Sequence, residues 1–540
     1  NLGIRIMKRL WLEVVIKKPW LMLLFGIVFF VVAGMGGQNL YFRGDYKVFF
    51  GSENPQLIAF EKMQGIFNKN ENANIIIAPK SGDVFNKNTL QLIKELTDES
   101  WQTPRSTRVD SLSNYQHTWA EEDDLIVEDL VMDIESMTPE AIARAKSIAT
   151  SEPNLVKRIV SENGEVAVIS ITVQLPDGDN PETAGEAALA VMEIAKSITD
   201  LTDSFKDKYP DHEFYHTGIV FMNDSFATEA QKDASTLVPL MFLMVIIILW
   251  VLLRSFTGTF ATLIIIIVSI ASTMGISGWM GYFLSTATVN VPTMVMTLAV
   301  ADCVHVISSM LYAMRQGQTK EQALEYSMNL NLMPIFITSA TTAIGFLTLN
   351  FSDVPVLADL GNLTALGVMI AFVLSVTLLP AILKILPMRA VKVTTGKSHW
   401  IERLGDKVID NHRRLLPISL IVMVIAITAT FNNNVNDIAT DYFDESTAFR
   451  QSTDFQQENI SGMSTIDFAL YSEEASGLNK PEMLKTVDAF SNWLRAQPEV
   501  DHVLTISDTF KRLNKNMHGD DESYYRLPQD RELSAQYLLL

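Results

Sequence analysis

The sequence predicts a multi-span α-helical membrane protein with α+β domains outside the membrane. Three observations lead to this fold class. The mean hydropathy of the 540-residue chain is positive, at +0.18, which soluble chains of this length rarely reach. Apolar runs long enough to cross a bilayer recur along the chain. Two long polar segments, residues 39–234 and 432–540, separate these runs.

Seven apolar runs are predicted to span the membrane. A helix of about 20 apolar residues is long enough to cross the hydrocarbon core. The predicted spans cover residues 19–38, 235–253, 259–282, 291–313, 331–351, 360–386 and 415–431. The spans at 235–386 form a block of five, whereas the first and the last each stand alone before a polar segment.

The placement of Lys and Arg predicts the orientation of the chain. Basic residues gather in residues 1–18 and 387–414, whereas loops such as "NFSDVPVLAD" are neutral or acidic. Since cytoplasmic loops carry the excess of Lys and Arg, both of these basic segments are expected in the cytoplasm. Residues 387–414 are predicted to form an amphipathic linker on the membrane surface. The two polar segments are then outside, which in a bacterial inner membrane means the periplasm.

Strand and helix patterns alternate in the first polar segment. Strands are expected at residues 73–80, 107–114, 165–175 and 212–220, and helices at 86–101, 138–152 and 182–205. This order predicts a pair of βαβ units in a ferredoxin-like α+β domain. The segment has no nucleophile elbow and no metal-spaced histidine cluster, so we do not expect an enzyme or a metal site.

The net charge of −20 arises mostly in the outer segments. The densest acidic stretch, "AEEDDLIVEDLVMDIES", is expected to be a solvated face, with a docking surface for a basic partner as the alternative. This charge argues against a nucleic-acid partner. The one cysteine, Cys303, lies within a predicted span, so no disulfide is expected in the outer domains.

An internal duplication is predicted from the start of the two polar segments. The first begins "GDYKVFFGSENPQLIAFEKM" and the second "TDYFDESTAFRQSTDFQQEN". This comparison matches Asp45-Tyr46 with Asp441-Tyr442, and Phe60 with Phe455. Each copy follows a lone span, so the second repeat is interpreted as truncated, with residues 432–540 as an incomplete second periplasmic domain. Five further spans would complete it.

A carboxylate lies in the middle of the predicted span 291–313. Asp302 would cost roughly 2.5–3.5 kcal/mol at the centre of a span, so such a residue is a functional candidate. Leu298, Asp302, His305 and Ser309 share one helical stripe. Asp302 and His305 are therefore expected to touch, face the bundle interior and form a proton relay. A purely packing role is the alternative for His305.

The next span offers a polar wall for this carboxylate. Thr338, Thr341 and Thr342 lie along one side of residues 331–351, together with Gly345. Their hydroxyls could donate hydrogen bonds to Asp302, with Ser309 as a further supporting group. Alternatively, the threonines bond the carbonyls of their own helix and only pack.

No cofactor is expected, and a proton gradient is the predicted energy source. Gly396-Lys397-Ser398 resembles the end of a phosphate-binding loop, but the position of its first glycine is Val391 and no strand precedes it. A carboxylate that is neutral in one state and charged in the other can couple proton movement to helix packing.

With these features, the chain resembles the resistance-nodulation-division (RND) superfamily, and within it the MmpL and hopanoid-exporter branch with its five-span block similar to sterol-sensing domains. The resemblance rests on "AVADCVH", "TSATTAIGF", "LGNLTALGVMIAF" and "TLLPAIL". It implies proton-driven export of lipids through periplasmic porter domains, with Asp302 as the relay carboxylate. The chain departs from the family's Gly-x-x-x-Asp-Tyr pattern, since it has Leu298 and Cys303 at the outer positions.

The leading functional hypothesis is a proton-driven exporter of lipidic or other hydrophobic and amphipathic molecules. Its expected partners are the membrane, a hydrophobic small-molecule substrate and a periplasmic carrier protein. The outer segment has no large insertion, which favours a monomer or dimer over a trimer. Two alternatives remain: a proton-driven motor that assists protein secretion, and a lipid-binding sensor or scaffold without net transport. Substrate identity and the direction of transport stay open.

Overall fold

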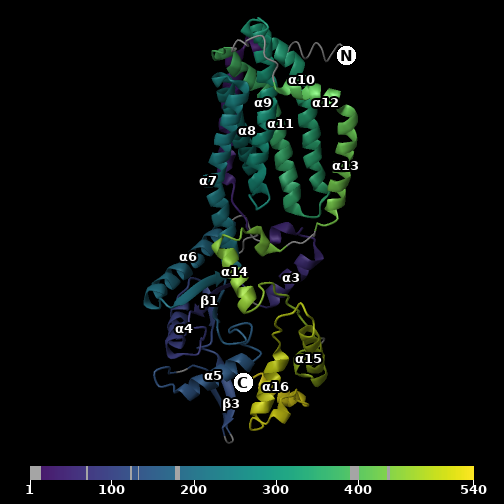
Figure 1. Cartoon of the computed structure of the whole chain (residues 1–540). Coiled ribbons are helices and arrows are strands. Elements are labelled where there is room, and N and C mark those ends of the chain that lie inside the picture. The colour runs from purple at the N-terminus through teal and green to yellow at the C-terminus, as the bar shows by residue number, and fades with distance from the viewer. Residues whose placement is uncertain are drawn as a thin grey trace. The chain divides into compact units, whose positions relative to one another are not determined.

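The computed structural model describes residues 14–44, 46–67, 71–121, 124–131, 133–176, 183–389, 400–433, 438–472 and 474–539 (Figure 1). The chain forms two compact units. The membrane unit comprises Asn1–Phe42, Val48–Gly51 and Ala230–Asp441, and the outer unit comprises Arg43–Lys47, Ser52–Glu229 and Tyr442–Leu540. The expected N-terminal segment before residue 14, Asp45 and the Gly396-Lys397-Ser398 stretch lie outside the described residues.

Each predicted span coincides with a helix that is long and apolar enough to cross a membrane. Among the described residues there are seven such helices. They are α2 (Pro19–Met35), α7 (Ile219–Leu253), α8 (Phe256–Trp279), α9 (Val291–Arg315), α10 (Lys320–Leu347), α11 (Pro355–Ile385) and α13 (His412–Thr430). The short helix α12 (Trp400–Asp410) lies in the expected amphipathic linker.

Two helices begin well before their apolar runs. α10 starts at Lys320 because Thr319 caps it, with Gln322 completing a reciprocal capping box. α7 starts at Ile219 rather than at residue 235, and the boundary between the two units falls inside it, after Glu229. The polar stretch "ATEAQKDAS" contains neither glycine nor proline, so nothing ends the helix where its hydropathy changes.

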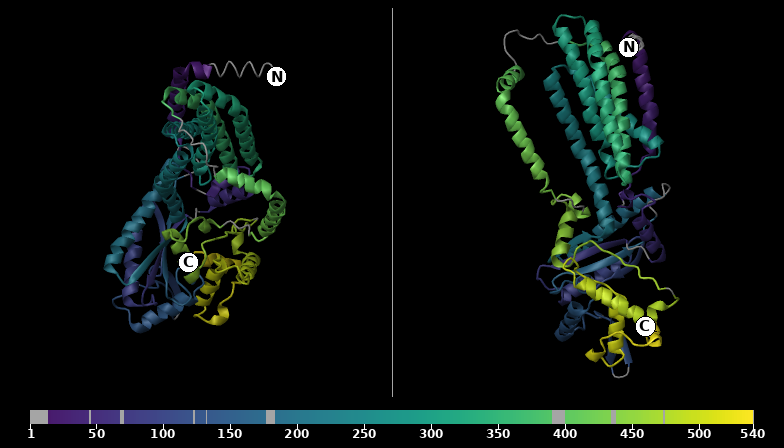
Figure 2. Two further views of the ribbon diagram at one scale, coloured as in Figure 1. Left: turned by 45° about the horizontal axis from the view of Figure 1, so that its top comes forward. Right: turned by 90° about the vertical axis from the view of Figure 1, so that its right-hand side faces the viewer.

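The core of the membrane unit is made by α8, α9, α10 and α11, which pack side by side (Figures 1 and 2). α2 joins this core through small residues. A Cβ on Gly275 would lie 1.9 Å from the carbonyl oxygen of Ala33, and one on Gly278 would lie 1.9 Å from that of Gly36. Glycine at these positions therefore allows backbone contact between α2 and α8.

The outer unit is built on a four-stranded antiparallel sheet in the order β2-β5-β1-β6. The strands are β1 (Glu71–Pro79), β2 (Ser106–Asp110), β5 (Ala167–Val173) and β6 (His212–Thr217). Helix α4 (Lys87–Ser100) connects β1 to β2, and α6 (Ala184–Lys208) connects β5 to β6. The two βαβ units thus interleave, since β5 lies between β1 and β2 and β1 lies between β5 and β6.

The acidic stretch forms a hairpin that the sequence interpretation missed. β3 (Gln116–Glu121) pairs with β4 (Asp124–Asp129) outside the main sheet, and α5 (Pro139–Ser151) follows with Thr138 as its N-cap, as expected. The carboxylates of Asp124, Glu128 and Asp129 are exposed. The sequence interpretation took the stretch as a solvated face, because the short apolar run Leu125–Val127 lies between acidic residues.

The second polar segment contains helices joined by extended stretches, with no strand among its described residues. Its helices are α14 (Ala448–Asn459), α15 (Pro481–Arg495), α16 (Ile506–Asn516) and α17 (Arg531–Tyr537). α14 packs on β6, with the rings of Phe455 and Tyr215 stacked 4.2 Å apart. α16 contacts the hairpin, where Thr118 Oγ1 donates to Asn516 Oδ1 at 2.7 Å, and its Arg512 pairs with Glu152 at the end of α5 at 3.3 Å.

The remaining elements include α3 (Pro55–Ile66) and short 3₁₀ turns at Gly36–Asn39, Tyr46–Phe49, Thr288–Asn290, Thr348–Phe351, Ala439–Tyr442, Gly477–Asn479 and Glu522–Tyr524. Three pairs of elements of the same type begin 393 residues apart, at Pro19 and His412, at Tyr46 and Ala439, and at Pro55 and Ala448. With this interval, Phe49 corresponds to Tyr442. This correspondence therefore differs by three positions from the sequence match of Asp45-Tyr46 with Asp441-Tyr442.

Candidate functional site

The candidate site centres on Asp302, which lies midway along α9. α9 begins with Pro292 in its first turn, where a missing backbone N–H costs nothing, and continues as an apolar helix to Arg315. Asp302 is 7% exposed. A carboxylate buried this far within a membrane-spanning helix needs a polar partner, because leaving it without one costs several kcal/mol.

Ser339 of α10 supplies that partner. Its Oγ donates a hydrogen bond to Asp302 Oδ2 at 3.3 Å, and Ser339 itself is buried. It is the one side-chain donor that Asp302 has among the described residues.

Polar side chains on α10 also bind α9 at positions that precede Ser339 in the chain. Ser327 Oγ donates to the carbonyl of Val306 at 2.6 Å, and Asn331 Nδ2 donates to the carbonyl of His305 at 3.2 Å. Ser327, Asn331 and Ser339 belong to a row of buried positions four residues apart, so the buried face of α10 winds slowly around the helix. This face fixes the rotation of α10 and delivers Ser339 to the carboxylate.

A second polar neighbourhood adjoins Asp302 on the other side of α9. Cys303 Sγ lies 3.6 Å from Ser375 Oγ of α11, and both side chains are fully buried. On α8, the hydroxyls of Ser269 and Ser272 are buried without a hydrogen-bond partner among the described residues. The membrane core therefore contains hydroxyl groups on three helices next to the one that carries Asp302.

The structure does not bring the other predicted site residues to Asp302. His305 is exposed on the surface of the described bundle, and Ser309 is half-buried. The side chains of Thr338 and Thr341 are exposed and bond carbonyls of their own helix, while Thr342 is half-buried. The expected contact between Asp302 and His305 is absent from the described residues.

Helix rotation explains these differences. A step of three residues falls about 60° short of a full turn, so His305 lies to one side of Asp302 on α9 and is exposed where Asp302 is buried. Thr338 and Ser339 differ by about 100° of rotation, so only one of them can face α9. Ideal helix rotation places Thr338, rather than Ser339, within about 20° of Ser327 and Asn331. The sequence therefore offered no clear signal for Ser339, which the structure places in a row of buried positions four residues apart along α10.

No group of three or more His, Cys, Asp and Glu residues that could hold a metal ion occurs within the described ranges. The chemistry that this arrangement offers is reversible protonation of a carboxylate. One hydroxyl donor steadies the charged form, while burial favours the neutral one.

The MMPL family matches residues 49–410, which is more than half of the chain and includes all five helices from α7 to α11. The chain belongs to the MMPL family. One relative of this MMPL protein is a proposed membrane protein of Methanocaldococcus jannaschii, which is 23% identical over 380 residues, or 68% of this chain and 91% of the relative. Membership of the MMPL family indicates a transporter of the RND type with hydrophobic substrates rather than an enzyme.

Proposed function

We propose that this MMPL protein is a proton-driven exporter of lipidic or other hydrophobic and amphipathic molecules from a bacterial inner membrane. The observation that carries the proposal is the buried carboxylate of Asp302, whose described donor is the hydroxyl of Ser339 on the neighbouring helix. This pair lies inside the five-helix block of a transporter family.

Proton movement supplies enough free energy for such a cycle. A proton crossing the membrane yields about 2.3 kcal/mol per 100 mV of potential. A difference of one pH unit adds about 1.4 kcal/mol. Protonation of Asp302 removes a buried charge and weakens the need for Ser339. The contact between α9 and α10 can therefore differ between the two protonation states.

We further propose that the chain carries an internal duplication, with residues 39–234 as a ferredoxin-like porter domain and 432–540 as part of a second one. The constant interval of 393 residues between corresponding elements supports this interpretation. So does the interleaved sheet order of the outer unit.

The exposed polar face of the membrane unit supports a second block of spans. His305, Thr338 and Thr341 are exposed on α9 and α10, within the segments long and apolar enough to cross a membrane. Polar residues at that depth are normally covered by protein. On this proposal His305 belongs to the interface with the second block and cooperates with Asp302 in the relay from there.

Asp302→Asn in proteoliposomes tests the function. The amide keeps the shape of the carboxylate but cannot exchange a proton. Gradient-dependent movement of a fluorescent lipid should fall at least about tenfold, as expected when a group essential to the cycle is lost. Asp353→Asn is the matched control, because Asp353 is exposed in the loop after α10. Normal gradient-driven transport by Asp302→Asn would exclude the proposal.

Mass spectrometry of co-purifying molecules separates the alternatives. A specific lipid that accumulates on Asp302→Asn supports export, and a carrier protein found with it supports delivery to the periplasm. A translocation subunit bound to the protein would indicate a secretion motor instead. A ligand unchanged by Asp302→Asn would indicate a sensor or scaffold. The same preparations report whether the protein is the proposed monomer or dimer.

A further inference from the structure

We infer that the membrane unit contains a binding groove for one acyl chain of an anionic phospholipid, formed by α2, α8 and α11. The groove has a volume of about 340 Å³. Its wall includes Leu23, Gly26 and Phe30 of α2, Ile264 and Val268 of α8, and Ile382 of α11. This inference is independent of the transport proposal, because it concerns a site away from Asp302 and needs no proton movement.

The lining determines the class of ligand. The residues of the groove are aliphatic or aromatic, apart from Gly26. An apolar cavity of about 150 Å³ already stays dry and accepts a benzene-sized molecule. A groove of more than twice this volume, open towards the surrounding bilayer and without polar side chains, is suited to a flexible hydrocarbon chain.

Hydrogen bonds at both ends of the groove attach α2 to its neighbouring helices. At one end, Lys384 Nζ donates to the carbonyl of Ile16 at 2.7 Å, which ties the start of α2 to α11. At the other end, Trp279 Nε1 donates to the carbonyl of Val32 at 3.1 Å, beside the glycine contacts with α8. These two ties define where the ends of α2 lie against α11 and α8, and the groove lies between them.

A third contact sets the depth of the groove. A Cβ on Gly26 would lie 2.8 Å from Leu378 Cδ1 of α11, so α2 and α11 touch at the level of Gly26. Residues 23–30 of α2 rise by about 10 Å, which is within one leaflet of a bilayer whose hydrocarbon core is about 30 Å thick.

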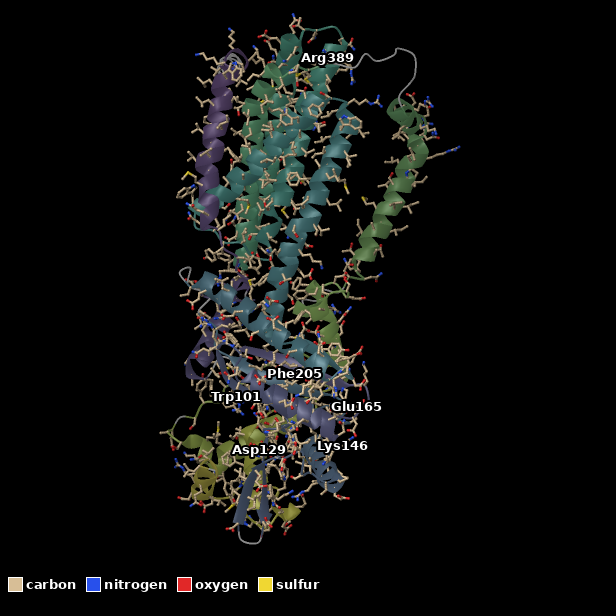
Figure 3. The ribbon with its side chains drawn as sticks, turned by 90° about the vertical axis from the view of Figure 1, so that its left-hand side faces the viewer. Trp101, Asp129, Lys146, Glu165, Phe205 and Arg389 are labelled. Carbon is tan, nitrogen blue, oxygen red and sulfur yellow. The ribbon has the colours of Figure 1, made fainter. Side chains whose placement is uncertain are left out.

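Charge at the mouth of the groove selects the headgroup. Lys18 directly precedes α2 and is exposed, and Arg389 is exposed just beyond the end of α11, where it is labelled in Figure 3. Lys384 lies at the same end and is also paired with Glu321. Lys18 and Arg389 belong to the two segments that are rich in Lys and Arg, residues 1–18 and 387–414. A lipid whose chain enters here places its phosphate near these groups, and a net negative headgroup is favoured over a zwitterionic one.

Photo-crosslinking of the full chain tests the inference. The protein is reconstituted in vesicles that contain phosphatidylglycerol or phosphatidylcholine with a diazirine in the acyl chain, and the adducts are mapped by mass spectrometry. We expect adducts concentrated on the groove residues of α2, α8 and α11, with phosphatidylglycerol labelling them more strongly. Lys18→Gln should reduce that preference about fivefold, since one Lys near the surface contributes that much, whereas Lys18→Arg should keep it.

A matched pair of substitutions on α8 tests the groove itself. Ile264→Trp fills the groove and should reduce these adducts about tenfold, because the chain loses several buried methylene groups. Ile267→Trp is the control, since Ile267 is 47% exposed and does not line the groove. Adducts spread evenly over the lipid-facing helices of the unsubstituted protein would overturn the inference. So would equal loss of adducts in both variants. The positions of the adducts on the unsubstituted protein test the inference even if Ile264→Trp does not fold.

Discussion

α2 and α13 start 393 residues apart and each precedes a polar segment, yet they differ in packing. α2 contacts α8 and α11 and buries Gly26 and Ala33. α13 has no buried residue among the described ones. α2 and the turn after it contain Gly26, Gly34, Gly36 and Gly37, whereas α13 contains no glycine. Hydropathy thus defines both helices as candidate spans, but small residues allow only one of them to make backbone contacts.

A pair of helices in the outer unit gives the opposite result, since here the later helix of the pair packs and the earlier one does not. α14 buries Phe449, Ser452 and Thr453 and packs on β6. Its counterpart α3 has no buried residue among the described ones. In each pair the helices start 393 residues apart but differ in packing, so this interval does not determine the neighbours of a helix.

The largest expected effect comes from Gly275→Ala. The added Cβ would lie 1.9 Å from the carbonyl oxygen of Ala33, so the backbones of α2 and α8 must separate. We expect a loss of about 3 kcal/mol in unfolding free energy, at the upper end for overpacking. Thermal unfolding in detergent measures it. Gly34→Ala is the control, because a Cβ added at Gly34 would have no heavy atom within 4 Å. Equal stability of the two variants would contradict the close contact.

A matched pair of alanines compares α2 and α13 directly. Ala33 is 4% exposed, and Ala426, at the corresponding position 393 residues later, is exposed. Ala33→Leu should cost about 2 kcal/mol through overpacking. Ala426→Leu should change stability by less than about 0.5 kcal/mol, as at an exposed site. The same thermal assay applies. A large loss in Ala426→Leu would show that α13 packs against a further span or a second copy.

The N-caps of α3 and α14 sharpen the comparison in the outer unit. Asn54 Oδ1 accepts from the backbone of Gln56 at 2.9 Å, and Thr447 Oγ1 accepts from that of Arg450 at 3.4 Å. Loss of a cap costs about 1 kcal/mol of helix stability. Thr447→Ala should lower the global stability, because α14 packs on the sheet. Asn54→Ala should only increase amide hydrogen exchange within α3. A global loss of stability in Asn54→Ala but not in Thr447→Ala would show that α3, rather than α14, is the packed helix.

The smallest effect is a pH dependence where α14 meets β6. His216 stacks on Phe221 with ring centroids 4.8 Å apart, and its backbone N–H donates to Ser452 Oγ. Burial lowers the pKa of His216 to about 4, with nearby Lys206 acting in the same direction and Asp203 opposing it. Because the unfolded chain binds the proton more tightly, stability falls as the pH drops from the ordinary His range towards 4. We expect about 1 kcal/mol between pH 7 and 5.5. His216→Phe should remove this part of the slope in chemical denaturation. An unchanged slope would show that His216 is not the titrating group.

Much of the fold could be predicted because its signals are local. Each predicted span became a helix, since a long apolar run in a membrane has to satisfy its own backbone. The strands β1, β5 and β6 coincide with stretches expected to be strands, the one in β5 from its alternation, and Thr138 capped α5 as expected. The hairpin β3–β4 was missed because its apolar run in β4 is only three residues long and lies between acidic residues. The early start of α7 was missed because hydropathy does not show where a helix begins.

The candidate site was predicted only in part, for a physical reason. The sequence by itself determined that Asp302 lies within a span, that its burial needs a partner, and that this span is one of five consecutive ones. Only the tertiary structure decided that Ser339 rather than Thr338 faces the carboxylate, that His305 points outward, and that α2 packs closely while α13 does not. Helical periodicity places residues on a stripe, but the rotation of each helix is set by contacts with its neighbours. Those contacts depend on small residues and polar groups far apart in the chain, such as Gly275 with Ala33.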